Sequence, residues 1–437
     1  MIYRKLYILL IFLLLNNCGT RDFFGFEEPE IKLQGERVSI LKDVSKKNTE
    51  ALSTTKVILK NPTVNLTWTQ SYNSPTHLSD NFKSTSKFNS LKRLVSGYSE
   101  DKESKILAQP LVMDNNIFFM DGKGVLYCFD IKQRRSVWRK KITDENEKNH
   151  NIGGGFALLN DKVIINSAYG DVIALSIKNG SILWKKNVFS PLRSAPTIYK
   201  NNILSLTLDN KLIVINSENG DTLWEHEGVI NNTTIMGSPK VGVDDNIIIV
   251  PYSNGDFYAL NYSNGLVLWK NSFLDIGTAD STNAFTDIDA NPVIFKNKVF
   301  LASSLGKVIA IDKRTGNRIW MKDITTTKTP LVYENSMFII DNNKNIINLD
   351  INNGSFRWLT KIKEEFSKDY YNIWHAPILI NNKLLIVGGD KKFLIVNPIS
   401  GKIEKVKKLS SLAASSPFVA NEKVYLMLRN GDIATIE

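Results

Sequence analysis

A glycine followed four residues later by a tryptophan recurs along most of this chain of 437 residues. From Trp138 onward, which stands in the same phase, successive tryptophans lie 46, 40, 45, 51 and 38 residues apart. That period is typical of the four-stranded blade of a β-propeller, and neither a helical hairpin nor a βαβ unit matches it. The complete pairs are Gly180/Trp184, Gly220/Trp224, Gly265/Trp269, Gly316/Trp320 and Gly354/Trp358.

Each repeat has the same internal order. A strand with alternating apolar residues comes first, as in 170–175, 255–260 and 306–311. A polar turn with glycine follows, because glycine adopts the positive φ that a tight hairpin needs. Proline marks the start of a unit, since it cannot donate to a sheet ladder. The pairs of a small or polar residue and proline that begin the units are Ala195-Pro196, Ser238-Pro239, Asn291-Pro292, Thr329-Pro330, Ala376-Pro377 and Ser416-Pro417.

The two ends of the repeat region set the number of blades. The turn at Gly401 has Lys405 in place of tryptophan, and residues 415–436 supply only three strands. We expect residues 64–69 to provide the fourth strand and close the ring, which removes an exposed sheet edge. The sequence thus predicts an all-β, eight-bladed propeller of four-stranded antiparallel blades from about residue 56 to 437. The expected wedges between blades are Trp68, Trp138, Trp184, Trp224, Trp269, Trp320 and Trp358.

The N-terminus has the pattern of an export signal. Arg4 and Lys5 precede a short apolar run that ends at Leu15, and Cys18 follows. We expect residues 1–17 to be a lipoprotein signal peptide and Cys18 to be lipidated, with an ordinary signal peptide as the alternative. Residues 18–55 are predicted to be a flexible lipidated tether. Residues 72–105 are interpreted as a long irregular insertion, either partly disordered or an excursion from the closing strand.

Composition and motifs do not indicate catalysis. The net charge is +11, but the lysines are scattered, so no nucleic-acid surface is expected. The four histidines are far apart, and no Cys-x-x-Cys occurs. We therefore expect no catalytic, cofactor-binding or metal-binding residues. Cys128 is interpreted as a small strand residue inside a sheet.

The repeat resembles the pyrroloquinoline-quinone-like family of eight-bladed propellers, through its recurring Ala-Leu…Asn-Gly-x-x-x-Trp pattern. One branch of that family comprises quinone-dependent dehydrogenases, which bind the quinone and calcium on the propeller axis. This chain lacks the adjacent cysteine pair that many of them use. A dehydrogenase or a related periplasmic propeller enzyme is the alternative function.

The other branch is the BamB family, lipoprotein subunits of the machinery that inserts β-barrels into the outer membrane. The order of signal, cysteine, tether and single propeller is similar. Residues 191–196 resemble that family's Leu-Arg loop, and residues 286–292 resemble its paired aspartates. Both are implicated there in binding the partner BamA. The resemblance implies that Leu192, Arg193, Asp287 and Asp289 contact a periplasmic domain of BamA.

Propeller geometry gives those four residues a second reason to act together. They lie in connections from the outermost strand of one blade to the innermost strand of the next, and all such connections emerge on one face. An exposed Leu192 beside charged residues would form a small interface. The structural alternatives are an Arg193 that bridges a loop carboxylate and aspartates that cap turns. We expect a non-catalytic scaffold, lipid-anchored at the periplasmic face of the outer membrane, with unfolded outer-membrane proteins as further candidate partners.

Overall fold

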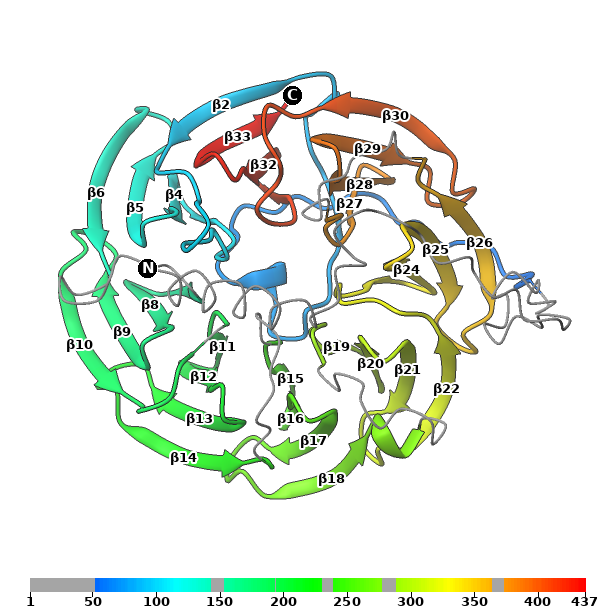
Figure 1. Ribbon diagram of the computed structural model, residues 1–437, viewed down its shortest axis with the longest axis horizontal. Helices are drawn as coiled ribbons and strands as arrows, with labels where there is room; N and C mark the ends of the chain where they lie inside the picture. The colour runs from blue at the N-terminus through cyan, green and yellow to red at the C-terminus, as the bar shows by residue number, and fades with distance from the viewer. Residues whose placement is uncertain (1–51, 143–152, 193, 230–238, 277–287, 364–372) are drawn as a thin grey trace, which may run out of the picture. The chain divides into compact units, whose positions relative to one another are not determined.

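The computed structural model describes residues 52–142, 153–192, 194–229, 239–276, 288–363 and 373–437. All of these described residues belong to one compact unit. Within the described residues the strands form eight sheets arranged as the blades of a ring (Figure 1). The predicted eight-bladed, all-β propeller is therefore confirmed.

The first four blades in chain order each contain four consecutive strands. Their elements are β3 (Leu111–Met113), β4 (Asn116–Met120), β5 (Val125–Asp130) and β6 (Arg135–Lys141); β7 (Gly154–Leu159), β8 (Lys162–Ser167), β9 (Asp171–Ser176) and β10 (Ile182–Asn187); β11 (Thr197–Tyr199), β12 (Asn202–Leu206), β13 (Lys211–Asn216) and β14 (Thr222–Glu227); β15 (Gly242–Asp244), β16 (Ile247–Pro251), β17 (Asp256–Asn261) and β18 (Val267–Ser272). A 3₁₀ turn, η2 (Leu274–Ile276), follows the fourth blade.

The last four blades follow the same order until the chain ends. Their elements are β19 (Val293–Phe295), β20 (Lys298–Ser303), β21 (Lys307–Asp312) and β22 (Arg318–Asp323); β23 (Leu331–Tyr333), β24 (Ser336–Ile340), β25 (Asn345–Asp350) and β26 (Phe356–Lys361); β27 (Ile378–Ile380), β28 (Lys383–Gly388), β29 (Lys392–Val396) and β30 (Ile403–Lys408); β31 (Phe418–Ala420), β32 (Lys423–Met427) and β33 (Asp432–Ile436). Antiparallel pairing joins neighbours in each blade, with the first strand innermost and the fourth outermost (Figure 1).

An N-terminal strand completes the eighth blade, as predicted, but it is not the expected one. Strand β2 (Leu91–Ser96) pairs antiparallel with β33, and Leu91 lies opposite Ile436. The prediction of residues 64–69 as the closing strand was wrong, and the stretch 72–105 is not simply irregular, because it contains β2. In β2, Leu91, Leu94 and Val95 are only half-buried, so its apolar signal is weak. A register shift between Arg93 and Val95 also breaks the alternation that marks a strand.

Residues 63–82, here called the axial segment, run along the inside of the ring instead of joining its rim (Figure 1). The segment includes the 3₁₀ turn η1 (Ser71–Asn73) and β1 (Asn81–Phe82), which pairs in parallel with β27. Its backbone bonds to the innermost strands of further blades are Trp68 N to Val112 O (2.7 Å), Leu158 N to Thr69 O (2.7 Å), Val243 N to Pro75 O (2.8 Å) and Ile294 N to Thr76 O (2.9 Å). The chain therefore occupies part of its own central channel.

Six of the seven predicted tryptophan wedges are confirmed. Each indole donates its Nε1 hydrogen to a carbonyl of the following blade, and each packs against that blade's turn glycine. The acceptors for Trp138, Trp184, Trp224, Trp269, Trp320 and Trp358 are the carbonyls of Ile177, Ser217, Tyr262, Lys313, Ile351 and Pro398. Trp68 is not such a wedge, because it lies on the axial segment, where it packs against Phe82 and Phe418.

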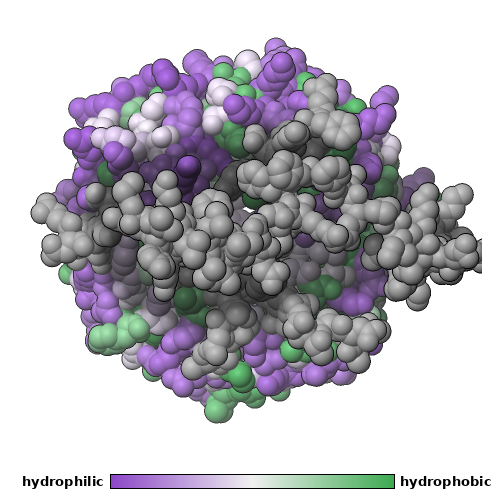
Figure 2. Space-filling model, viewed as in Figure 1, coloured by the Kyte–Doolittle hydropathy of each residue, from purple (hydrophilic) through white to green (hydrophobic). Residues whose placement is uncertain are grey.

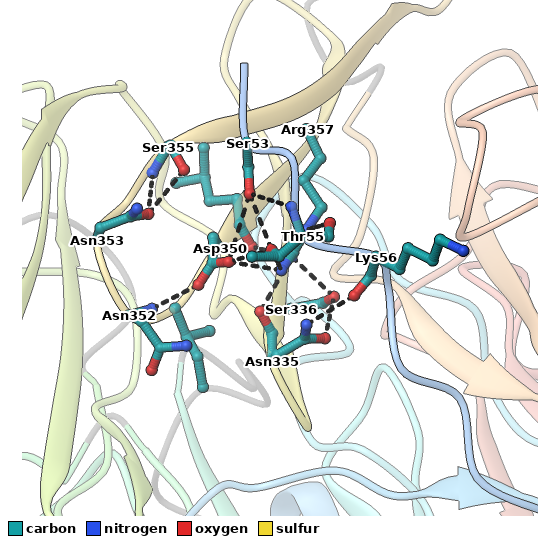
Figure 3. A network of polar contacts seen from close by, with 12 residues as sticks. Ser53, Thr55, Lys56, Asn335, Ser336, Asp350, Asn352, Asn353, Ser355 and Arg357 are labelled. Atoms are coloured by element: carbon teal, nitrogen blue, oxygen red, sulfur yellow. Dashed lines mark hydrogen bonds and ion pairs between the residues drawn. The ribbon is translucent and has the colours of Figure 1, made fainter. Parts of the chain in front are cut away.

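The chain ahead of the axial segment is fixed to blade 6 by a polar network (Figure 3). Arg357 and Asp350 form a buried ion pair, with Nη2 2.8 Å from Oδ2. The hydroxyl of Thr55 also donates to Asp350, and Arg357 donates to Thr55 O at 3.0 Å. The pKa of Asp350 is lowered: burial opposes the shift, but the hydrogen bond from Thr55, the backbone N–H of Asn352 and the charge of Arg357 outweigh it. This cluster is called the blade-6 latch below.

Candidate functional site

The predicted partner-binding residues belong to two connections on one face of the ring. One joins β10 to β11, and the other joins η2 to β19. In an antiparallel four-stranded blade, such connections lie at the opposite end from the turns that join the first strand to the second. We call this side the connection face. Arg193 and Asp287 fall outside the described residues, whereas Leu192 and Asp289 lie within them.

Leu192 is buried, so the expectation of an exposed leucine was wrong. Its side chain is 0% exposed and packs in the core between blades 2 and 3, beside Ile164 and Ile203. Backbone bonds from Leu192 N to Ser167 O (3.2 Å) and from Leu208 N to Pro191 O (2.8 Å) draw the loop onto turns of both blades. Leu192 therefore holds the base of the loop and offers no contact surface.

The exposed apolar residue of this loop is Phe189. Its side chain is 95% exposed, and its backbone has φ 58, a conformation uncommon for a bulky residue. The amide of Phe189 donates to Asn187 Oδ1 at 2.8 Å, and the hydroxyl of the next residue, Ser190, donates to Asp209 Oδ1 at 2.7 Å. A backbone bond of Phe189 and a side-chain bond of Ser190 thus hold the loop that carries this exposed phenyl ring.

Phe189 was not expected to be functional from the sequence. The available signal was an aromatic residue between the end of an apolar strand and Ser190-Pro191, where a loop was already predicted. Exposed aromatic rings in loops are enriched at binding surfaces. The outer rim visible in Figure 2 is mostly hydrophilic, with apolar atoms in small scattered groups.

Asp289 is half-buried and lies near Lys328, which leads into blade 6. Burial lowers the pKa of Lys328, and the negative charge of Asp289 opposes that shift. The side chain is thus electrostatically coupled to the neighbouring connection.

The axial residues do not fit a quinone cofactor. The axial segment occupies the centre of the ring, and the cavity that remains at the connection face holds about 240 Å³. Sites for drug-sized molecules usually measure about 300–1,000 Å³. No cluster of three or more His, Cys, Asp or Glu side chains that could hold a metal ion occurs among the described residues.

Two other sequence-based expectations concern cysteines. Cys128 lies in β5 and is buried, as predicted, and burial raises the pKa of its thiol to about 12. Cys18, the expected lipidation site, falls outside the described residues. In the part of the chain that is described, the helices are all too short or too polar to cross a membrane.

Known proteins show similarity at the level of both sequence and fold. An uncharacterized protein of Rickettsia conorii is 28% identical over 222 residues, which cover 50% of this chain and 53% of that protein. The match thus spans about half the length of that relative. Outer membrane protein assembly factor BamB of Shewanella oneidensis is 23% identical over 345 residues, covering 75% of this chain and 83% of its own length.

Two solved structures share the propeller fold. BamB from Moraxella catarrhalis has a TM-score of 0.63 at 17% identity, covering 79% of this chain and 97% of its own. A europium-containing methanol dehydrogenase has a TM-score of 0.66 at 13% identity, covering 82% and 89%. At these identities the likeness concerns the fold alone, and it does not separate a scaffold from an enzyme.

A family profile identifies the family of the chain. The profile described as outer membrane protein assembly factor BamB matches residues 122–360, more than half of the chain. The matched region includes the loop of Phe189 and Leu192 and all six tryptophan wedges. This chain therefore belongs to the BamB family of outer membrane protein assembly factors.

Proposed function

We propose that this protein is a non-catalytic scaffold of the outer-membrane β-barrel assembly machinery, and that its connection face docks on a periplasmic domain of BamA. The observation that carries the proposal is the ring of Phe189, which is 95% exposed on a hydrogen-bonded loop of that face. Membership of the BamB family supports the proposed role in outer-membrane protein assembly.

Phe189 takes the role that the sequence suggested for Leu192. An aromatic anchor with few torsional freedoms loses little entropy when a partner pocket covers it. Arg193 follows in the same loop, and Asp289 lies on the connection two blades further along the ring. Charged residues around such an anchor determine how the two proteins are aligned and how fast they associate, more than how tightly they bind. Leu192 keeps the loop in place from below.

Lipidation at Cys18 would hold the protein at the periplasmic face of the outer membrane. Several acyl chains on one cysteine give stable attachment, whereas a single chain gives only marginal attachment. A tether from Cys18 would reach the propeller at the blade-6 latch, where Thr55 is bound to Asp350. In this proposal, any help to unfolded barrel proteins passes through BamA.

The test is the affinity of the isolated periplasmic domain of BamA for matched variants. Phe189→Ser should weaken binding by roughly tenfold or more, as for a hot-spot aromatic residue. The control is Ile399→Ser, which replaces a side chain that is 60% exposed in a turn on the opposite face. Equal affinity of Phe189→Ser and the control for BamA would refute this docking site.

A further inference from the structure

Eight residues form a ring around the propeller axis at the connection face. In every blade the first strand ends in three residues that pair with the second strand in the same register. The residue concerned stands two positions before the first of these three, as Ala195 does before Thr197 in blade 3 and Asn291 before Val293 in blade 5. In chain order they are Gln109, Gly155, Ala195, Lys240, Asn291, Thr329, Ala376 and Ser416. We call this set the axial ring.

Contacts between neighbours hold the axial ring together. Gln109 Nε2 donates to Ser416 O at 3.1 Å, which joins the first blade to the last. Lys240 N donates to Asn291 Oδ1 at 2.7 Å, and Asn291 N donates to Thr329 Oγ1 at 3.0 Å. A Cβ at Gly155 would lie 2.7 Å from the Cβ of Ala195, so those two members are in close contact.

The axial segment provides the floor of the ring. Tyr72 is hydrogen-bonded to Thr329 and Asn291, and burial raises the pKa of its hydroxyl. Above this floor lies the cavity of about 240 Å³, lined by Tyr72 and by axial-ring residues that include Gln109, Lys240 and Ser416. The cavity has both polar and apolar lining, and it is large enough for a small ligand or for the end of a peptide.

Lys240 is the one charged residue of the axial ring. It is half-buried, and burial lowers the pKa of its ammonium group to about 8. Among the described residues, no carboxylate forms an ion pair with it. Its positive charge also lowers the pKa of His77 below the floor. An ammonium group drawn out of water without an acidic neighbour is costly, and a bound anion would offset that cost.

We propose that the axial pocket binds a carboxylate group, held by the ammonium of Lys240 and by neutral donors of the pocket such as the Gln109 amide. One lysine matches one negative charge, whereas a phosphate dianion favours several cations or a bidentate arginine. The carboxylate belongs to a small organic acid or to the C-terminus of a peptide. The site is independent of docking on BamA, because it uses the axis and not the loop of Phe189.

The experiment is calorimetric titration of the full chain with four probes: acetate, a short peptide with a free C-terminus, the same peptide amidated, and inorganic phosphate. Each is titrated into the wild type, Lys240→Gln and the control Lys296→Gln, a lysine in the β19–β20 turn on the opposite face. Circular dichroism checks that the variants fold. NMR of the lysine side chains follows the pKa of Lys240 as a probe binds.

Acetate or the free-carboxylate peptide should bind the wild type and Lys296→Gln with equal affinity. Its affinity for Lys240→Gln should be lower by roughly tenfold or more. Binding should also raise the pKa of Lys240, because a negative charge then lies beside the ammonium. Binding of acetate and not of the peptide identifies a small acid as the ligand, and binding of the peptide that is lost on amidation identifies a peptide C-terminus. The proposal is overturned if no carboxylate probe binds, if phosphate binds at least as tightly, or if folded Lys240→Gln keeps wild-type affinity.

Discussion

The indole of Trp184 lies against Gly220 of the next blade and donates its Nε1 hydrogen to Ser217 O at 3.0 Å. A Cβ at Gly220 would lie 2.9 Å from Cε3 of that indole. The same pair of contacts, a turn glycine under a tryptophan of the preceding blade, recurs at five further interfaces. The glycine-tryptophan repeat of the sequence is thus a repeat of blade-to-blade joints.

Gly220→Ala should lower the free energy of unfolding by more than Gly306→Ala does. Gly220 has φ 78, which costs an alanine about 1–2 kcal/mol, and the clash with the indole adds a further cost of about 1–3 kcal/mol. Gly306→Ala is the matched control, because Gly306 has φ 84 but its Cβ would meet only Thr325 Oγ1, at 3.0 Å. Urea unfolding measures both, and equal losses would argue against the joint.

The blade-6 latch should depend on both members of its buried ion pair. Arg357→Met leaves the Asp350 carboxylate buried without its cation, which typically costs about 3–5 kcal/mol. The segment around Thr55 should then exchange its amide hydrogens faster, because Arg357 no longer holds Thr55 O. The double variant Arg357→Met, Asp350→Leu should recover much of the stability, but the amide hydrogens around Thr55 should still exchange fast. Hydrogen exchange unchanged in Arg357→Met would contradict the latch.

Ring closure by β2 predicts a sharp difference between two N-terminal deletions. A chain that starts at residue 61 keeps the axial segment and β2, and it should stay folded and monomeric. A chain that starts at residue 98 lacks both, so β33 becomes an exposed edge and the axis loses its filling. Thermal unfolding and size-exclusion chromatography should show a lower melting temperature and aggregation for the shorter chain only. Similar behaviour of the two chains would rule out this closure.

His77 should make the fold sensitive to mild acid. Burial lowers its pKa to about 3, with a smaller contribution from Lys240, while its hydrogen bond to Pro292 O opposes the shift. The unfolded chain protonates this histidine near pH 6.5 and the folded chain does not, so stability is full above that pH and falls as the pH drops toward 3. Through this one histidine, the free energy of unfolding changes by at most about 1.4 kcal/mol per pH unit.

The variant His77→Gln removes this proton linkage and keeps a group that can bond to Pro292 O. The free energy of unfolding, measured by urea titration between pH 7 and pH 4, should therefore fall less steeply in His77→Gln than in the wild type. Parallel curves for the two proteins would show that His77 is not the source of the acid sensitivity.

The sequence predicts the ring well because each blade repeats one local pattern. Strands such as β9 and β21 are short apolar runs that are buried on both faces, and the turn glycines and tryptophans fix their spacing. Closure is harder to predict, because β2 gains its place only by pairing with a strand that is more than 330 residues away in the chain. Residues around Trp68 have a clearer strand pattern, but their partners are the innermost strands on the axis.

The candidate site was predictable in its location and not in its details. Topology alone places the connections on one face, but burial of an individual loop residue depends on tertiary hydrogen bonds. Leu192 and Phe189 are both apolar residues of one short loop, and the bonds of Pro191 and Ser190 turn one inward and the other outward. The axial ring was visible only in part, because five of its members precede the prolines that mark the start of a unit, but its members share no single residue type.

The most direct test of the scaffold account is site-specific photocrosslinking in living cells. A photoreactive amino acid replaces Phe189 on the connection face or Ile399 on the opposite face, and products are identified by mass spectrometry. The account predicts a crosslink to a periplasmic domain of BamA from position 189 and none from position 399. A BamA crosslink from position 399 alone, or none from position 189, would contradict it.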